Sequence, residues 1–525
     1  MQFKNKSTRT AFFIGAGFFL LIVILELAAI LRLNQGFFVY TLDDAYIHLA
    51  LAENIAQGHY GINPGELSAP SSSILWPFLI APLASFEYFP FIVNVVFSLI
   101  TLAVLAHMLA EMLDVQDSPA RAAMTAALMV LFILVTNMVG LVFIGMEHAL
   151  QVLVTAVIVW GLIREVRHER LDGWLPAVIA LGPLVRYELL GISLSGICYL
   201  FLRKYTKQAG AALLLTLLPL AGFSYYLVSL GLAPFPTSVL VKSSVVESGG
   251  SWGSLLANIN ISLIHSRGRL LLLGAIFLLG VALFSKENLN RRKLAAASLT
   301  AVLLHLVVGK YGFYYRYEIY IWAFVLLVGL FLANGLLKQV LQPDRDLFSR
   351  VKVILLFVFL VTACYQYIFA LTGLPLASNN IYQQHYQMRR FAAEFYRQPV
   401  AVNDIGYVSY KNDHYVLDLW GLASAEALHM RLTRPDSGWV NDLAQSKNVQ
   451  FAMIYEDWFG NIPKGWIKMG ELHLGSRLVT PQQSSVSFFA LNRQVYEGSL
   501  PLLQSFIQTL PEGVEFILDQ ETESR

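Results

Sequence analysis

Long apolar runs alternate with short polar connections over the first 371 residues of the chain. A transmembrane helix needs about 20 mainly apolar residues, and most of these runs approach or exceed that length. They predict an α-helical, polytopic membrane module over residues 1–371. The runs lie at 11–33, 74–113, 122–143, 149–163, 174–202, 211–232, 270–284, 294–308, 317–337 and 353–371.

Basic residues indicate which connections face the cytoplasm. They cluster at 164–170, 203–207, 286–293 and 338–352, whereas the connection 34–73 has no Lys or Arg. Because Lys and Arg accumulate in cytoplasmic loops, we expect the first loop, residues 34–73, to face outward and the N-terminus to be cytoplasmic. The expected location is the cytoplasmic (inner) membrane of a bacterium, with several passes.

Two of the apolar runs do not fit a single crossing. Residues 174–202 have basic clusters at both ends, so we expect a short hairpin with Arg186-Tyr187-Glu188 at its tip. Residues 74–113 are too long for one pass and contain prolines, which interrupt helices. We expect a membrane-dipping element there, followed by a true span. These assignments predict about 11 crossings.

The tail, residues 372–525, is more polar and shows alternating patterns. Such alternation is typical of half-buried strands, and a late segment at 500–510 has a helical pattern. The tail therefore predicts a small extracytoplasmic α/β domain. The strands are expected within PVAVNDIG (399–406), HYVLDLWGL (414–422), VQFAMIYEDW (449–458) and SVSFFAL (485–491).

Composition narrows the class of protein. The chain has 525 residues, of which 56% are hydrophobic and 14% charged, whereas soluble domains carry roughly 25% charged residues. A disordered chain, a soluble enzyme and a nucleic-acid binder are excluded, the last also because the net charge is only +2. The two cysteines, Cys198 and Cys364, lie in apolar stretches and predict neither a disulfide framework nor a cysteine metal site.

Carboxylates at the predicted outer ends of the helices are candidates for chemistry. Asp43 and Asp44 open a predicted amphipathic interfacial helix that also carries His48. Asp43 has a structural alternative, because aspartate commonly caps helix N-termini. Glu147 lies in the second outer turn, where it either contributes to a site or stabilises the positive end of a helix dipole.

Cations lie at the same predicted face. Arg186 and Glu188 form either a functional pair near membrane depth or a structural ion pair. Lys242 either binds phosphate or snorkels, and Arg316 lies in a tyrosine-rich stretch that also resembles an interfacial aromatic belt. Together with the carboxylates, these cations suit a lipid-linked phosphate, since arginine grips phosphate oxygens in a forked geometry.

A sugar on a polyprenyl phosphate has a good leaving group, so one carboxylate base is sufficient for its transfer. The spacing of histidines and carboxylates shows no dedicated metal-ligand set. We therefore assign no metal residues and no certain cofactor, and a divalent metal stays compatible with the sequence.

Several motifs resemble a known superfamily. DDAYIHLALAENIAQGHYGINPGE (43–66), followed by SSSILW (71–76), resembles the first outer loop of GT-C-fold glycosyltransferases. It is most similar to the arabinofuranosyltransferase-like, polyprenyl-phosphate-sugar-dependent branch. The first-loop motif is the specific one, and the others are short and scattered over most of the chain. These are GMEHAL, LVRYELL, PTSVLVKS and NDIGYVSY…VLDLWGL.

The resemblance implies an inverting transferase that moves a sugar from a polyprenyl-phosphate donor to a glycan, lipid or protein acceptor at the outer membrane face. It implies that Asp43 is the catalytic base and Asp44 a neighbouring candidate. It also implies lipid-phosphate contacts for Arg186 and Lys242, and it places Glu147 at the family's second acidic position.

The sequence departs from the family pattern in two places. Tyr187 replaces the proline of the usual R-P-E, and the serines at 71–73 replace a T-S-P lead. Both changes leave the sugar unassigned. A transporter or lipid-linked-sugar flippase is the alternative from another class, and a non-catalytic scaffold for envelope enzymes is a third.

Overall fold

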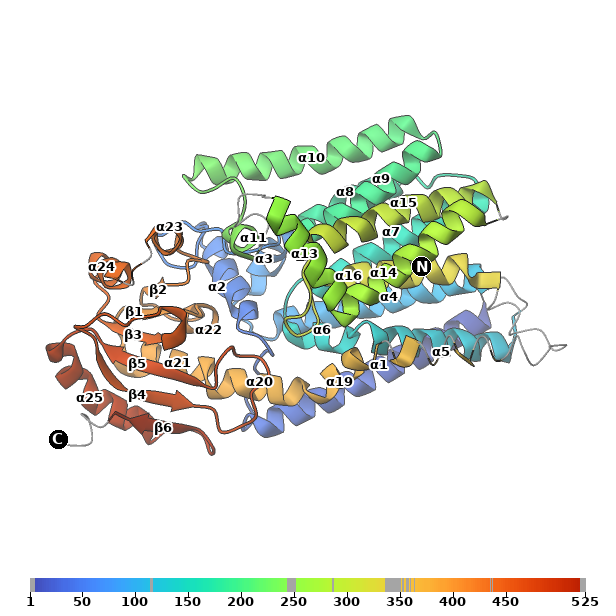
Figure 1. Ribbon diagram of the computed structural model, residues 1–525. Coiled ribbons are helices and arrows are strands. Elements are labelled where there is room, and N and C mark those ends of the chain that lie inside the picture. Colours follow the sequence, from blue (N-terminus) through green and yellow to red (C-terminus); the bar gives the residue numbers. More distant parts are fainter. Residues whose placement is uncertain are drawn as a thin grey trace.

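The computed structural model consists of a helical region and a C-terminal α/β domain that lie side by side (Figure 1). The predicted division into an apolar helical part and an α/β tail agrees with this arrangement. The structure describes residues 5–519 except 114–116, 243–251, 286–287, 336–350, 352–353, 356–357, 359, 363, 435 and 437.

Five helices in the described residues are long and apolar enough to cross a membrane, and these mark the chain as a membrane protein. A sixth candidate is the pair formed by α5 (Pro119–Val135) and α6 (Met138–Ile144), which is bent by 44°. The five are α1 (Lys6–Leu33), α4 (Phe89–Leu113), α7 (His148–His168), α10 (Thr206–Ser229) and α14 (Ser266–Phe284).

The expected count of about 11 crossings is therefore wrong for the described residues, where five or six spans are found. The physical reason is length, because several apolar runs form helices shorter than the roughly 20 residues of a full span. Part of the run 353–371 lies outside the described residues, and its end forms α19 (Tyr365–Thr372). The short apolar helices are α8 (Leu175–Val185), α9 (Leu190–Leu202), α13 (Trp252–Ile264) and α16 (Ile319–Leu332).

Two local predictions are confirmed. The run 174–202 forms a pair of short helices, α8 and α9, because Arg186 is extended (φ −155°, ψ 140°) and ends α8. The run 74–113 divides into a short helix, α3 (Leu75–Ile80), a 3₁₀ turn and the long helix α4. The other helices described in this region are α2 (Asp44–Ala56), α11 (Thr237–Lys242) and α15 (Leu289–Val308), the last of which carries part of the basic cluster 286–293 in its first turns.

The C-terminal domain contains a mixed six-stranded sheet in the order β2-β1-β3-β5-β4-β6. β1, β2 and β3 are parallel, and the other pairings are antiparallel. All four predicted strands are confirmed, whereas β4 and β6 were not predicted. The strands are β1 (Val400–Val402), β2 (Val416–Asp418), β3 (Phe451–Ile454), β4 (Ile467–His473), β5 (Ser485–Ala490) and β6 (Glu515–Leu518).

Helices cover both faces of this sheet, so β1, β2 and β3 are buried along their whole length and are not half-buried as the predicted alternation implied. On one face, α23 (Ala425–Thr433) and α24 (Gly438–Ser446) share a core with β2 and β3. On the other, α25 (Arg493–Ile507) and the turn Phe391–Tyr396 pack against the sheet through a cluster of phenylalanines. α25 contains most of the predicted helix 500–510.

The C-terminal domain is fixed to the first loop by specific contacts. The rings of Tyr46 and Tyr407 stack with centroids 3.6 Å apart, and both hydroxyls donate to Glu87. The side-chain amide of Asn63 donates to and accepts from the backbone of Val416, at 2.9 Å each way. Two elements from the start and the end of the chain therefore form one junction. Further helices that lead into the domain are α20 (Leu374–Gln383), α21 (His385–Arg390) and α22 (Gly406–Ser409).

Candidate functional site

The predicted first-loop helix forms as α2 (Asp44–Ala56), and Asp43 precedes it directly. The prediction that it is amphipathic and interfacial is wrong, because every residue from 45 to 52 is buried within the protein. Asp43 occupies the N-cap position, but its side chain makes no capping hydrogen bond. Its two carboxylate oxygens instead accept hydrogen bonds of 2.8 Å from the backbone N–H groups of Gly406 and Tyr407. The carboxylate of Asp43 therefore does not cap helix α2, which was the structural alternative for this residue.

Gly406 permits this close approach. A Cβ atom at that position would lie 2.2 Å from the backbone oxygen of Asp43 and 2.5 Å from its carboxylate. Only glycine lets the backbone come so near without displacing a neighbour. The contact between Asp43 and the C-terminal domain thus depends on a residue in the NDIG stretch after β1.

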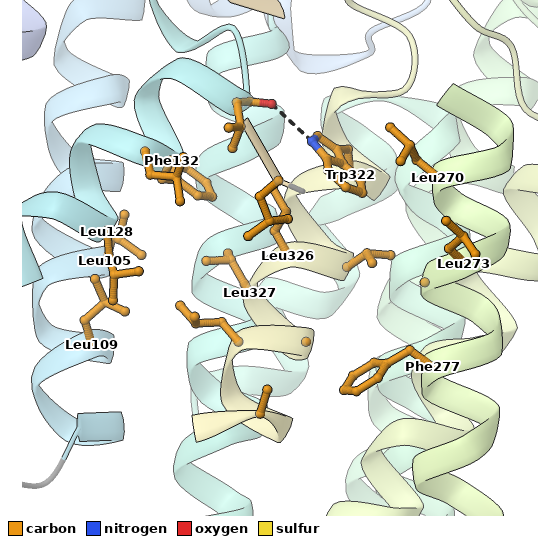
Figure 2. Close-up of a pocket in the computed structure, with 18 residues that line it drawn as sticks. Leu105, Leu109, Leu128, Phe132, Leu270, Leu273, Phe277, Trp322, Leu326 and Leu327 are labelled. Atoms are coloured by element: carbon orange, nitrogen blue, oxygen red, sulfur yellow. Dashed lines mark hydrogen bonds between the residues drawn. The ribbon is translucent and has the colours of Figure 1, made fainter. Parts of the chain in front are cut away.

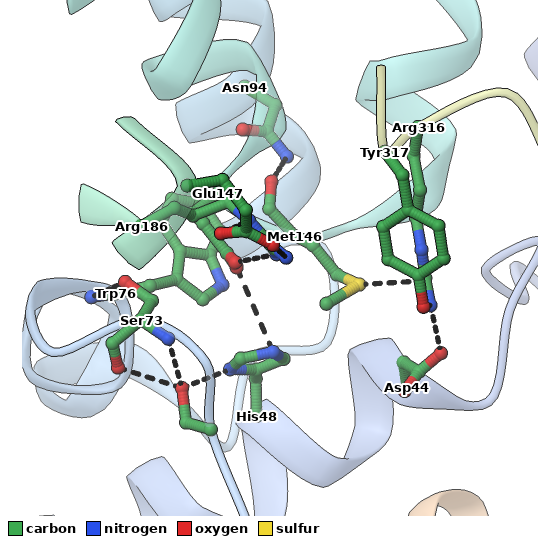
Figure 3. A network of polar contacts seen from close by, with 12 residues as sticks. Asp44, His48, Ser73, Trp76, Asn94, Met146, Glu147, Arg186, Arg316 and Tyr317 are labelled. Carbon is green, nitrogen blue, oxygen red and sulfur yellow. Dashed lines mark hydrogen bonds and ion pairs between the residues drawn. The ribbon is translucent and has the colours of Figure 1, made fainter. Parts of the chain in front are cut away.

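Asp44 points in a different direction, into the helical region. Its carboxylate is paired with the guanidinium of Arg316 at 2.6 Å, and this arginine is fully buried. Arg316 also contacts the sulfur of Met146 and the hydroxyl of Tyr317, as Figure 3 shows. Neighbouring aspartates therefore bind two different parts of the molecule.

A second group, which we call the Arg186 cluster, comprises His48, Glu147, Arg186 and Glu188. Arg186 donates to Glu147, which is fully buried, and to Glu188 through two bonds of 2.5 and 3.0 Å. His48 Nε2 lies 3.7 Å from Glu147, and its Nδ1 lies 3.2 Å from the Ser71 hydroxyl. The structure thus brings together four residues predicted from three separate turns (Figure 3).

His148 was not selected from the sequence but belongs to the same neighbourhood. Its side chain is buried, and within the described part of the chain neither ring nitrogen has a hydrogen-bond partner. The charged groups that act on it include Arg186, Arg316 and His48. Buried polar atoms are normally hydrogen-bonded, so this imidazole keeps unused capacity close to two buried arginines.

A third group, the junction cluster, comprises Asp43, His385 and Asp404. Their possible metal-ligand atoms all lie within 4.8 Å of one another, and His385 Nε2 is 3.3 Å from Asp404 Oδ2. Burial raises the pKa of Asp43 to about 6, although nearby His385 opposes the shift. The pKa of His385 is raised above its ordinary value. Burial alone would lower it, but the neighbouring carboxylates of Asp43 and Asp404 raise it by more. Of the described residues, these three are the set that could hold a metal ion.

The remaining candidate, Lys242, has a side chain that lies outside the described residues. His385 offers no signal in the sequence. Asp404 does, because it lies near the end of the predicted strand segment 399–406, and ligands often bind at the carboxyl ends of parallel strands.

Residues 379–489 match a family described as a domain of unknown function, DUF8728. The match runs from α20 to β5, so it contains His385 and Asp404 but not the first loop. No curated protein matches the chain.

Proposed function

We propose that this protein is a GT-C-type membrane glycosyltransferase that moves a sugar from a polyprenyl-phosphate donor to a glycan, lipid or protein acceptor at the outer membrane face. The observation that carries the proposal is the buried imidazole of His148, which has no hydrogen-bond partner among the residues that the structure describes and is acted on by two buried arginines, Arg186 and Arg316. Such a place suits an anionic ligand rich in hydrogen-bond acceptors, as a phosphate is.

The phosphate of the donor would bind Arg186 by replacing one of the two carboxylates that now pair with this arginine. Glu147 is fully buried beside Arg186, whereas the side chain of Glu188 is 35% exposed. A phosphate that reached Arg186 would therefore displace Glu188 more readily than Glu147. Arg186 supplies the forked pair of donors that such a phosphate needs.

The lipid part of the donor needs an apolar surface inside the membrane. A cavity of about 380 Å³ lies between α4, α5, α14 and α16 (Figure 2). Trp322, in the first turn of α16, lines it, so one wall of the cavity continues into the loop that carries Arg316. Other lining residues are Leu109, Leu128, Phe132, Leu270 and Phe277.

The proposed reaction is a single displacement with inversion at the sugar. The acceptor oxygen forms a bond to the anomeric carbon while the bond from that carbon to the phosphate oxygen breaks. Asp43 takes the acceptor proton, and the polyprenyl phosphate leaves with the electron pair. Asp43 suits this role because it lies at the meeting point of the first loop and the C-terminal domain, with Asp44 beside it as the second candidate.

The test is a lipid and glycan profile of cells that lack the gene, complemented with the wild-type protein, Asp43→Asn or the control Asp413→Asn. Asp413 is an exposed residue of the C-terminal domain. We expect one sugar to be missing, and its polyprenyl-linked form to accumulate, in the deletion and in Asp43→Asn only.

Two results would contradict the proposal. A normal profile with Asp43→Asn would remove Asp43 from the chemistry. If proteoliposomes with purified protein moved a labelled polyprenyl-linked sugar across the bilayer without any acceptor, the chain would instead be a flippase.

A further inference from the structure

The junction cluster joins three segments that are far apart in the sequence. Asp43 comes from the loop before α2, His385 begins α21, and Asp404 follows β1. The side chain of His385 is only 2% exposed, and its Nδ1 has no hydrogen-bond partner within the described part of the chain. Its Nε2 faces Asp404 at 3.3 Å and is therefore the ring nitrogen that can share a cation with the two carboxylates.

The separations fit a shared cation. Zinc binds nitrogen and carboxylate oxygen at about 2.0–2.2 Å, so neighbouring ligands of a tetrahedral ion lie roughly 3.3 Å apart. The distance from His385 Nε2 to Asp404 Oδ2 is 3.3 Å, and all three donor atoms lie within 4.8 Å of one another. Three protein ligands also leave a fourth position open, as in catalytic zinc sites.

Asp43 has the capacity to serve as a ligand. A carboxylate has about four lone-pair positions, and the backbone N–H groups of Gly406 and Tyr407 use two of them. Hydrogen bonds of this kind orient ligating carboxylates in metal sites. The Asp404 side chain is 27% exposed, so an ion has a route of entry from solvent.

We propose that Asp43, His385 and Asp404 bind one divalent transition-metal ion, zinc or manganese, between the first loop and the C-terminal domain. Two carboxylates balance the charge of such an ion, and the mixture of imidazole and carboxylate favours these metals over calcium or magnesium. The site shares Asp43 with the proposed sugar transfer, but the two are tested separately, because metal binding is measured without any substrate and on variants of the other two ligands.

The experiment uses the full-length protein, purified in detergent with a tag that contains no histidine and stripped with EDTA. Zn²⁺ or Mn²⁺ is returned, excess is removed, and bound metal is measured by mass spectrometry. We expect about one ion per wild-type chain, and at least about tenfold weaker binding in His385→Asn and Asp404→Asn. The controls His473→Asn and Asp413→Asn, at more exposed positions, keep wild-type binding.

Two results would overturn the proposed metal site: both ligand variants retain the ion, or wild-type protein binds none at micromolar metal. The three residues would then form only an ion-paired cluster. Because a ligand variant can misfold, the visible absorption of Co²⁺ bound to the wild-type chain provides a second readout, and tetrahedral bands are expected. The same variants leave Asp43 intact. Bound metal with no sugar transfer therefore refutes only the proposed function, and sugar transfer by wild-type protein that binds no metal refutes only the site.

Discussion

The Arg186 cluster and the junction cluster differ in how completely their polar groups are paired. Arg186 donates three hydrogen bonds to two carboxylates. His385, in contrast, has one contact at 3.3 Å and an unpartnered Nδ1 within the described residues. Paired buried charges fix a geometry and are costly to break, whereas underused donors keep the capacity to bind a ligand. Loss of Arg186 should thus lower stability as well as donor binding, whereas loss of a residue of the junction cluster should act mainly on ligand binding.

Arg186→Met should have the largest effect, on stability. It leaves Glu147 fully buried without its cation, which typically costs about 3–5 kcal/mol. The free energy of unfolding in detergent measures this loss. The double variant Arg186→Met/Glu147→Gln should recover most of it, because no charge is then left unpaired.

Arg164→Met is the matched control for the buried arginine. Arg164 pairs with Glu111 and Asp172, but the three side chains are 25–31% exposed. Its loss should cost at most about 1 kcal/mol. If the two substitutions lowered the free energy of unfolding equally, burial would not be what makes the ion pairs of Arg186 important for stability.

Asp43→Asn should reduce the turnover of sugar transfer by about 100-fold or more, the range for loss of a general base. The fold should survive, because the amide oxygen still accepts one of the two backbone hydrogen bonds. Turnover and the unfolding midpoint measured on the same preparation check this. A fall in both together would place Asp43 among the structural residues.

Asn63→Ala tests the attachment of the C-terminal domain. It removes two buried hydrogen bonds to the backbone of Val416 and should cost about 1–3 kcal/mol. Hydrogen exchange at the Val416 amide is the measurement, and the exposed Asn461→Ala is the control. Unchanged protection at Val416 would show that the domain docks without this contact.

Glu87→Gln should have the smallest effect, and it depends on pH. Burial raises the pKa of Glu87, so the folded protein binds this proton more readily than the unfolded chain and gains stability as pH falls. Glutamine resembles the protonated form. The variant should thus be more stable than wild type at pH 8, and the difference should vanish toward about pH 4.5, near the ordinary pKa of glutamate. Thermal unfolding at several pH values, with exposed Glu512→Gln as control, tests the sign.

Elements with a strong local pattern could be predicted from the sequence. The first-loop helix, the hairpin around Arg186 and four strands all follow from spacing within a short window. β6 has only four residues, and β4 contains Gly470 next to an irregularity in its pairing, so neither has a clear alternation. The number of spans was wrong because apolar composition does not fix where a helix ends.

The candidate site was predictable to a similar degree. Arg186 and Glu188 are near neighbours in the sequence, and their ion pair was one of the two alternatives weighed. The junction cluster was not predictable, because Asp43 meets His385 and Asp404 only when the two ends of the chain fold together. His148 carries no signal either, since its lack of a partner is a property of the folded surroundings.

The opposite directions of Asp43 and Asp44 have a mechanical consequence. Consecutive Cα atoms are about 3.8 Å apart, and across that single peptide unit the chain is fastened to the C-terminal domain on one side and to Arg316 on the other. A peptide unit is rigid, so it transmits displacement and does not absorb it. A tilt of the C-terminal domain would therefore be passed to the buried guanidinium of Arg316 through Asp43 and Asp44.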